Sequence, residues 1–277
     1  MKILLTGSSG KIGSVFALKM ASKAFCPLRK DLDLSEPVNA KVLDSIDGVI
    51  YAAGINGRKV LDFEHSVTRA VNIENPALLA GFAAEKAIPF LYLSSDDVFD
   101  GEKGAAYVES DRKNPLNRYG EEKSEAEDLI LKANKEAKIV RYPLVFGYDN
   151  AFPERAQFVD HLIDQTRQGL AEFSLSTKTV TSPSFVSDLV EKSFEIFFEK
   201  EASGIFHVFN EGKTSFFDFG QYLRFKFCSD TRLSAENSTF SDPDFNKKAY
   251  APMHSERIPA LRSFYKALDD YFEKGIT

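Results

Sequence analysis

The sequence has no tryptophan and only two cysteines, Cys26 and Cys228, among its 277 residues. The spacing of these cysteines fits neither a metal site nor a redox motif. We expect two free thiols in or near the core and no disulfide. Three of the histidines, His65, His161 and His207, are far from one another and from acidic clusters in the sequence. They are expected to pack or lie at the surface, and no bound metal is expected.

Long apolar runs and an excess of positive charge are also missing. No stretch reaches the apolar length of a membrane span, and the apolar run in MKILLTGSSG is too short for a signal peptide. The formal net charge is −6 and the basic residues are scattered, which argues against a nucleic-acid-binding surface. We therefore expect a cytoplasmic protein with a small-molecule partner, and neither nucleic acid nor a membrane among its partners. A homodimer is one alternative for its assembly.

The first 150 residues alternate between apolar runs and amphipathic segments. Strands are expected in KILLTG, AFCPL, DGVIYAAG, IPFLYLSS and AKIVRYPLVFG, with helices over residues 12–22, 63–86 and 115–134. The first helix would bury one face, made of Ile12, Val15, Phe16, Leu18 and Met20. Strands that alternate with helices predict a parallel sheet covered on both faces. The predicted fold class is α/β, with a Rossmann-like doubly wound parallel sheet.

Beyond residue 150 the alternation weakens. We expect helices over residues 154–169 and 260–274, in the second part of STKTVTSPSFVSDLVEKSFEIFFEK and in SFFDFGQYLRFKF, a strand in GIFHVFN, and irregular structure over 229–259. The sequence therefore predicts a dinucleotide-binding Rossmann domain over residues 1–150, with contributions from about 177–210. Residues 151–277 would mainly form a small C-terminal α/β substrate lobe.

The first expected strand leads into a glycine-rich loop, GSSGKIG. Gly7, Gly10 and Gly13 follow the spacing G-x-x-G-x-x-G between a strand and a helix. Such a loop allows a tight turn and lets backbone approach a diphosphate, while the following helix presents its positive end to the anion. A dinucleotide site is therefore expected.

The end of the second expected strand bears on which dinucleotide binds. A carboxylate there suits the ribose diol of NAD, and a basic residue suits the extra phosphate of NADP. Arg29 and Lys30 directly follow CPL, so NADP(H) is favoured. Asp31 and Asp33 keep NAD(H) open.

A serine, a tyrosine and a lysine follow the strand IPFLYLSS. Ser94 and Ser95 end this strand, where chemistry is concentrated in doubly wound sheets. Tyr119 and Lys123 are four residues apart, so a helix would place them on one face. A nearby lysine cation lowers the pKa of a tyrosine, and a serine hydroxyl can hold a carbonyl oxygen. These residue types suit proton transfer at an oxygen while a hydride moves at the carbon.

Five motifs, in order, resemble the extended short-chain dehydrogenase/reductases, and within them the dTDP-4-dehydrorhamnose reductases and related sugar-nucleotide reductases. These motifs are LSSDDVFDG, NPLNRYGEEKSEAE, RYPLVFG, TSPSFVSDLV and GIFHVFNEGKTSFFDFGQYL. The resemblance covers essentially the whole chain. It implies that Ser95, Tyr119 and Lys123 are the catalytic residues. Tyr119 would protonate the carbonyl oxygen, and Lys123 would hold the cofactor ribose and lower the pKa of Tyr119.

The same resemblance implies a set of cofactor-binding residues. Besides Tyr119 and Lys123, the set comprises Gly7, Ser9, Gly10, Lys11, Ile12, Gly13, Arg29, Asp33, Leu34, Ala52, Ala53, Gly54, Pro143 and Val145. The glycine loop would line the diphosphate, Arg29 the 2′-phosphate, and Asp33 with Leu34 the adenine. Pro143 and Val145 would pass near the nicotinamide.

Two departures from the family pattern concern the substrate. Asp97 stands where the reductases carry tyrosine, so its carboxylate faces either the substrate or solvent. The family's carboxy-terminal nucleotide-seating run survives only in outline as APMHSERI, in which His254 and Arg257 are candidate replacements. With Ser94, these residues form the candidate substrate-binding set. We expect Arg118, Glu121, Glu122 and the remaining acids of GEEKSEAEDL to lie on the exposed side of their helix.

Three functions follow from these features. The first is an NADP-dependent reductase of a keto group on a nucleotide-linked sugar. The second is a sugar-nucleotide epimerase or dehydratase with tightly bound NAD, which Asp96 and Asp97 after Ser95 keep open. The third is a non-catalytic NADP-binding regulatory subunit, against which the Ser95, Tyr119 and Lys123 set argues.

Overall fold

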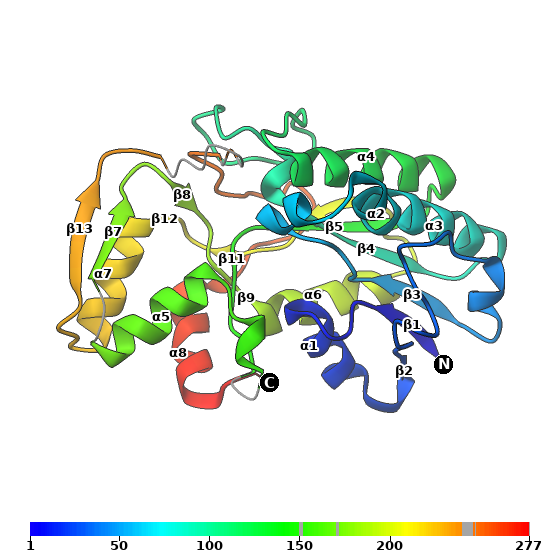
Figure 1. Ribbon diagram of the computed structural model, residues 1–277, viewed down its shortest axis with the longest axis horizontal. Coiled ribbons are helices and arrows are strands. Elements are labelled where there is room, and N and C mark those ends of the chain that lie inside the picture. The colour runs from blue at the N-terminus through cyan, green and yellow to red at the C-terminus, as the bar shows by residue number, and fades with distance from the viewer. Residues whose placement is uncertain (150–151, 170–171, 240–245, 247, 277) are drawn as a thin grey trace. The chain divides into compact units, whose positions relative to one another are not determined.

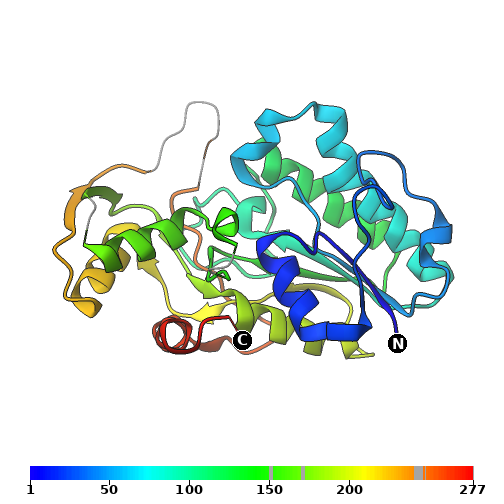
Figure 2. The same cartoon turned by 60° about the horizontal axis from the view of Figure 1, so that its bottom comes forward.

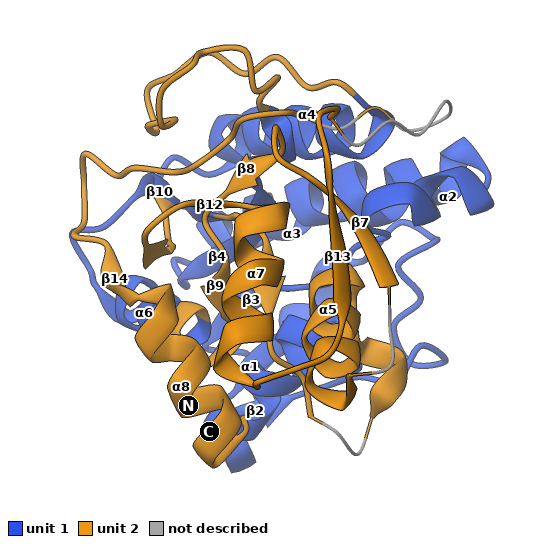
Figure 3. Ribbon diagram, turned by 90° about the vertical axis from the view of Figure 1, so that its left-hand side faces the viewer, with its two compact units in different colours: residues 1–98, 117–141, 190–206 blue, residues 99–116, 142–189, 207–277 orange. Residues whose placement is uncertain are grey.

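The computed structural model describes residues 1–149, 152–169, 172–239, 246 and 248–276. The chain forms two compact units, each discontinuous in sequence (Figure 3). The first unit comprises residues 1–98, 117–141 and 190–206, and the second comprises residues 99–116, 142–189 and 207–277. The boundary between the two compact units therefore does not lie at residue 150, since each unit contains segments from both sides of it. The separate cofactor and substrate roles of residues 1–150 and 151–277 stay predictions.

A six-stranded sheet with the order β10-β5-β4-β3-β1-β2 forms the centre of the first unit. Its strands are β1 (Ile3–Thr6), β2 (Ala24–Phe25), β3 (Gly48–Tyr51), β4 (Phe90–Ser95), β5 (Lys138–Tyr142) and β10 (Gly204–His207). β1 pairs in parallel with both β2 and β3, and β3 pairs in parallel with β4. Every residue of β1, β3 and β5 is buried, because helices cover both faces of the sheet. The predicted doubly wound sheet is confirmed.

Helices pack against the two faces of this sheet. On one face lie α2 (His65–Arg69), the π-helical segment η4 (Ala70–Glu74), α3 (Asn75–Glu85) and α4 (Arg118–Ala133) (Figure 1). On the other face lie α1 (Lys11–Met20) and α6 (Val186–Phe198), an arrangement that Figure 2 shows from a second direction. The ring centroids of Phe16 in α1 and Phe194 in α6 are 5.0 Å apart. Short 3-10 turns complete the unit: η1 (Ala21–Lys23), η2 (Ala40–Leu43), η3 (Gly57–Asp62) and η5 (Asp96–Val98).

The single helix expected over residues 63–86 is broken by the π-helical turn η4. Pro76, in the first turn of α3, has no N–H to donate to the carbonyl of Asn72 four residues earlier. The Tyr92 hydroxyl on β4 donates to that carbonyl instead, at 3.1 Å. Isolated π turns inside helices often occur at functional sites.

In the part of the second unit that the structure describes, short strand pairs and helices alternate along the chain. β6 (Val145–Phe146), β7 (Glu172–Ser176) and β11 (Asn210–Glu211) pair in parallel with β9 (Ser184–Phe185), β13 (Arg232–Glu236) and β14 (Leu261–Ser263), respectively. β8 (Val180–Thr181) pairs in antiparallel fashion with β12 (Thr214–Ser215). The 3-10 turn η6 (Pro153–Arg155) precedes the helices, which are α5 (Phe158–Gln168), α7 (Phe216–Lys226) and α8 (Phe264–Lys274).

Several sequence-based expectations about single elements are wrong. AKIVRYPLVFG forms two strands, β5 and β6, because the chain leaves the large sheet after Tyr142 and pairs with β9. The segment expected to be irregular contains β13, and the last helix is preceded by β14. Leu18 is 61% exposed because it lies on the solvent side of α1. Cys228 is exposed, and Cys26 is only partly buried.

Among the residues that the structure describes, no helix combines the length and the apolar character that crossing a bilayer requires.

Candidate active site

The glycine loop between β1 and α1 has the close backbone packing that a diphosphate cradle needs. Gly7 has φ +68°, and a Cβ at this position would lie 2.6 Å from the Cα of Ala53. A Cβ on Gly13 would overlap the carbonyl oxygen of Gly7. Gly10 caps α1 without any side-chain hydrogen bond to the helix end. The three glycines therefore keep their own positions free of side chains at the amino-terminal end of α1, where an anion is stabilised.

An open pocket of about 260 Å³ lies beside this loop, within the first unit. Its lining includes six residues that the sequence predicted for the cofactor, which are Gly7, Ser9, Arg29, Asp33, Leu34 and Ala53. It also includes apolar side chains that were not predicted from the sequence, among them Phe63, Val67 and Val71. A glycine cradle, an apolar wall and a cation at one rim fit an adenosine diphosphate that carries an additional phosphate.

Arg29 and Asp33 at the rim of this pocket are neighbours. Asp33 accepts hydrogen bonds from the backbone and the hydroxyl of Ser35, at 2.9 and 2.7 Å. These bonds hold the pKa of the Asp33 carboxyl below its ordinary value, and Arg29 adds to the effect. Arg29 Nε lies 3.6 Å from Asp33 Oδ2, and the Arg29 side chain is 78% exposed. The carboxylate is thus partly engaged, while the guanidinium still faces solvent.

Tyr119 lies in the first turn of α4, which Asn117 caps by accepting a hydrogen bond from the Gly120 amide at 2.9 Å. Burial raises the pKa of Tyr119, and the nearby Asp97 and Asp96 carboxylates raise it further. A hydrogen bond with the Ser95 side chain acts in the opposite direction. Ser95 and Tyr119 are therefore brought together, although β4 and α4 are separated along the chain.

Asp97 lies beside the predicted catalytic serine. Its backbone amide donates to Ser95 Oγ at 3.2 Å, and Ser95 Oγ lies 3.3 Å from Asp97 Oδ2. This placement puts the carboxylate at the reactive end of β4. Its contact with a substrate stays a prediction.

Lys123 is buried, and its ammonium contacts β4. Lys123 Nζ donates to the Tyr92 hydroxyl at 3.0 Å and to the carbonyl of Leu93 at 2.8 Å. Burial lowers the pKa of Lys123 to about 7, while the carboxylates of Glu127 and Glu122 oppose this shift. Lys123 Nζ lies 5.8 Å from the ring centroid of Tyr119. Burial and nearby acids raise the pKa of Tyr119 in this structure, and the lowering of that pKa by Lys123 stays a prediction.

Gly54, just after β3, lies next to Lys123. A Cβ on Gly54 would be 3.7 Å from Lys123 Nζ and 3.4 Å from Asn72 Oδ1. Two residues predicted to bind the cofactor from separate motifs are therefore close in space. The absence of a side chain at Gly54 leaves this approach to the ammonium open.

Ser94 and Glu127 lie buried in contact with each other, although the sequence predicts an exposed position for Glu127. Glu127 and Arg141 are 0% and 1% exposed, and Glu127 accepts from Arg141 Nε and Nη2 at 2.9 and 2.7 Å. Ser94 is buried too, and its hydroxyl donates to Glu127 Oε1 at 2.6 Å. The Ser94 hydroxyl is thus engaged in an internal contact, and its role in substrate binding stays a prediction. Glu127 faces the core because its partners come from the sheet.

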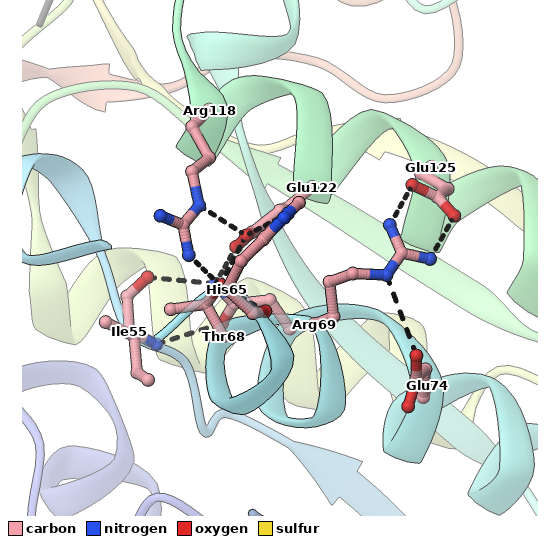
Figure 4. A network of polar contacts seen from close by, with 9 residues as sticks. Ile55, His65, Thr68, Arg69, Glu74, Arg118, Glu122 and Glu125 are labelled. Carbon is pink, nitrogen blue, oxygen red and sulfur yellow. Dashed lines mark hydrogen bonds and ion pairs between the residues drawn. The ribbon is translucent and has the colours of Figure 1, made fainter. Parts of the chain in front are cut away.

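Glu122 is also buried, against the expectation of an exposed acid. It is 2% exposed, and it lies among residues from α2, η4 and the start of α4 (Figure 4). His65 Nε2 is 3.7 Å from Glu122 Oε1, so His65 is not isolated from acids as expected. Asn72 and Thr68, which contact Glu122, carry no signal in the sequence, since both are ordinary helix residues by pattern.

Four predicted site residues belong to the second unit. Val145 lies in β6 and pairs with Ser184, and Pro143 precedes this strand. The backbone of His254 contacts Tyr107 and the ring of His207. Arg257 donates its amide to Ser255 Oγ at 3.1 Å. Cofactor binding by Pro143 and Val145, and substrate binding by His254 and Arg257, stay predictions.

The remaining predicted cofactor residues lie in the first unit, near those of the pocket lining. Lys11 is buried in the first turn of α1, and Ile12 follows it. Ala52 directly follows β3. Over the described part of the chain, no three His, Cys, Asp or Glu side chains gather as metal ligands would.

Comparison with known proteins agrees with this geometry. The model of a family described as "RmlD substrate binding domain" matches residues 1–268. A "Probable low-salt glycan biosynthesis reductase" of Haloferax volcanii is 27% identical over 261 residues, which are 88% of this chain and 86% of that protein. A dTDP-4-dehydrorhamnose reductase of Sinorhizobium fredii is 26% identical over 231 residues, which are 80% and 77% of the two chains.

A solved structure gives an independent comparison of the fold. The dTDP-4-dehydrorhamnose reductase of Bacillus anthracis, in complex with NADP, superposes with a TM-score of 0.86 at 20% identity. The match covers 99% of this chain and 100% of the other. At this identity the likeness shows a shared fold.

Proposed function

Since the chain belongs to the family of the RmlD substrate binding domain, we propose that it is an NADP-dependent reductase of a keto group on a nucleotide-linked sugar. The resemblance that the motifs indicated is confirmed at the level of the family. One observation carries the proposal. Within one compact unit, Ser95 and Tyr119 are brought together at the end of β4, and Lys123 lies beside Gly54 after β3.

The relatives support this choice of reaction. Both curated relatives described above carry the name of a reductase, and one is named for a nucleotide-linked keto sugar. The structural relative was solved with NADP. A cytoplasmic location and a homodimer remain expectations from the sequence.

The cofactor would be held by residues of the first unit. Gly7, Gly10 and Gly13 would surround the diphosphate, and Arg29 would pair with the 2′-phosphate at the rim of the pocket. Lys123 would reach the ribose hydroxyls past Gly54, which has no side chain to block the approach. When bound, NADPH supplies the hydride that reduces the keto carbon.

Tyr119 would give its proton to the keto oxygen, so that the product is an alcohol. Its raised pKa keeps the phenol protonated at neutral pH, which populates the donor form. The hydroxyl of Ser95 would hold the same oxygen and orient it toward Tyr119. Asp97, beside Ser95, would offer a carboxylate to a hydroxyl of the sugar.

The variant Tyr119→Phe tests this assignment. With dTDP-4-dehydrorhamnose as the probe, NADPH oxidation should fall by at least about 100-fold, as expected for the loss of a general acid. The Kd for NADPH should change by less than about twofold, because Tyr119 is one of many residues in the cofactor-binding set and phenylalanine keeps its ring. Tyr265→Phe, at an exposed tyrosine, is the matched control and should keep full activity. Full activity of Tyr119→Phe would refute the proton-donor role.

The alternatives give different results with the wild-type protein. An epimerase or dehydratase would release tightly bound NAD on denaturation and would convert its sugar without net oxidation of NADPH. A regulatory subunit would bind NADPH, but it would not oxidise NADPH whichever keto sugar is added. Either result would replace the reductase proposal.

A further inference from the structure

Glu122, next to Lys123 on α4, is the centre of a buried hydrogen-bond network. Its Oε1 accepts from the Thr68 hydroxyl at 2.6 Å and from Arg118 Nε at 3.1 Å. Its Oε2 accepts from Asn72 Nδ2 at 2.6 Å. Figure 4 shows Arg118 and Glu122 extending from α4 toward His65 and Thr68 on α2. Both carboxylate oxygens are thus engaged by the helical segments that follow β3.

Asn72 connects Glu122 to the backbone after β3 by hydrogen bonds to Ile55. Its amide nitrogen donates to the carbonyl of Ile55 at 3.0 Å, and its amide oxygen accepts from the Ile55 N–H at 2.9 Å. This two-way contact requires one orientation of the Asn72 amide. Glu122 selects that orientation, because a carboxylate can only accept and therefore must face the NH₂ group.

The backbone of Asn72 is linked to Lys123 as well. The Tyr92 hydroxyl donates to the carbonyl of Asn72 at 3.1 Å and accepts from Lys123 Nζ at 3.0 Å. Adjacent residues of α4 therefore reach Asn72 by two routes, Glu122 directly and Lys123 through Tyr92. Gly54 lies between the two ends of this arrangement, near both Asn72 Oδ1 and Lys123 Nζ.

We propose that Glu122 is a positioning residue, which through Asn72 fixes the Gly54–Ile55 backbone against Lys123 at the place where the cofactor ribose binds. This inference rests on the proposed function in one respect, namely that Lys123 and Gly54 receive the ribose of NADPH. The network itself is a property of the first unit alone.

The negative charge of Glu122 also acts on Lys123, because it favours the protonated ammonium form. Lys123 is faced by Tyr92 from β4 and by Tyr119, Glu122 and Glu127 from its own helix. Burial lowers the pKa of Lys123 to about 7, and the Glu122 carboxylate counteracts part of that shift. Loss of the carboxylate should therefore favour the neutral amine.

Other charged groups face Glu122 and must be separated from this effect. Arg118 donates a hydrogen bond to Glu122, and His65 Nε2 lies 3.7 Å from it. From α2, Arg69 has its pKa raised by its hydrogen bond to Glu125 and in part by the Glu122 charge. The His65 side chain is exposed, so its replacement should leave the fold unchanged. The variant His65→Gln identifies any contribution of the imidazole to a pH profile.

The test is Glu122→Gln, with Glu125→Gln as its matched control. Glutamine keeps the shape but offers one acceptor oxygen, and its NH₂ group must face Asn72, Thr68 or Arg118, which all donate to Glu122. Glu125 lies on the same helix and pairs with Arg69 at the surface, so its variant removes an equal charge outside the network.

Hydrogen exchange at the Ile55 amide is the direct readout. In Glu122→Gln this exchange should become at least about tenfold faster, as expected when a hydrogen bond to a charged group is lost. The Kd for NADPH should rise by about tenfold. Glu125→Gln should change neither. Unchanged Ile55 exchange in a folded Glu122→Gln protein would overturn the proposal.

A pH profile separates positioning from a general loss of structure. NADPH affinity should fall at high pH as Lys123 loses its proton. In Glu122→Gln this alkaline limb should move to lower pH by about half a unit or more, because Lys123 loses a neighbouring negative charge. It should not move in Glu125→Gln or in His65→Gln. A uniform loss of affinity without a shifted limb would also overturn the role assigned to Glu122.

A milder variant covers the case in which Glu122→Gln does not fold. Thr68→Val removes one hydrogen bond to Glu122 and keeps the Asn72 contact. It should raise the Kd for NADPH by about threefold and accelerate Ile55 exchange, and no change in either would refute the proposal.

The exchange readout also distinguishes the positioning role of Glu122 from the proposed reductase function. If wild-type protein reduces no keto sugar but Glu122→Gln shows both effects, the positioning role stands and the reductase function fails.

Discussion

Replacing Glu127 by glutamine should destabilise the first compact unit by about 3–5 kcal/mol, the range observed when one partner of a buried ion pair is removed. Glu127 and Arg141 are 0% and 1% exposed, and Glu127 accepts hydrogen bonds from Nε and Nη2 of Arg141 and from the Ser94 hydroxyl. Glutamine preserves the shape. It removes the negative charge that faces the buried guanidinium of Arg141, and the loss of this charge pairing is the source of the predicted destabilisation.

Urea and thermal unfolding measure this loss. A change of this size should lower the midpoint of thermal unfolding by about 10 °C for a chain of this length. Glu125→Gln again serves as the control, since its pair with Arg69 lies at the surface and should contribute less than about 1 kcal/mol. Because Ser94 precedes Ser95, reductase activity measured below the unfolding transition should also fall in Glu127→Gln.

A double variant decides whether the cause is the lost charge pairing. Glu127→Leu combined with Arg141→Met removes both charges, and buried pairs replaced by apolar residues often retain their stability. This protein should therefore be more stable than Glu127→Gln alone. The reasoning is wrong if Glu127→Gln unfolds within about 1 kcal/mol of wild type, or if the double variant is as unstable as the single one.

Further predictions concern the cofactor site. Arg29→Ala should raise the Kd for NADPH by at least about tenfold and leave that for NADH nearly unchanged, whereas Lys30→Ala should affect neither, because only Arg29 lines the pocket. Gly13→Ala should weaken NADPH by at least about tenfold in a binding titration, since its Cβ would overlap the backbone of Gly7; unchanged affinity would remove the loop from the cofactor site. The pKa of Lys123 is lowered from 10.5 to about 7 in the folded state, so the unfolded chain binds more protons between these values. The unfolding free energy should therefore rise between pH 7 and about 9.5, and rise less in Lys123→Met; equal slopes would contradict the shifted pKa.

The candidate catalytic residues could be named from the sequence because their signals are local. Ser95 ends an apolar strand, and Tyr119 and Lys123 have helical spacing in a motif that begins at a capping asparagine, Asn117. Such patterns depend on the order of neighbouring residues. The structure places the three residues in one compact unit, as a doubly wound sheet requires.

The state of these groups could not be predicted in the same way. The pKa of Tyr119 is raised, and Lys123 contacts Tyr92 and Leu93, because burial and partners from β4 decide both. Neither quantity depends on spacing along α4. The apolar wall formed by Phe63, Val67 and Val71 likewise results from how the chain after β3 folds back over the pocket.

The sequence by itself determined the α/β sheet, the glycine loop, the family and the positions of the serine, tyrosine and lysine. Only the tertiary structure decided which acids of GEEKSEAEDL are buried. Glu122 and Glu127 lie in a run that is mostly hydrophilic, but each accepts hydrogen bonds from distant segments, Asn72 and Arg141 among them. A carboxylate is stable in the interior only when such donors compensate its lost hydration, and the pattern of a single helix cannot reveal them.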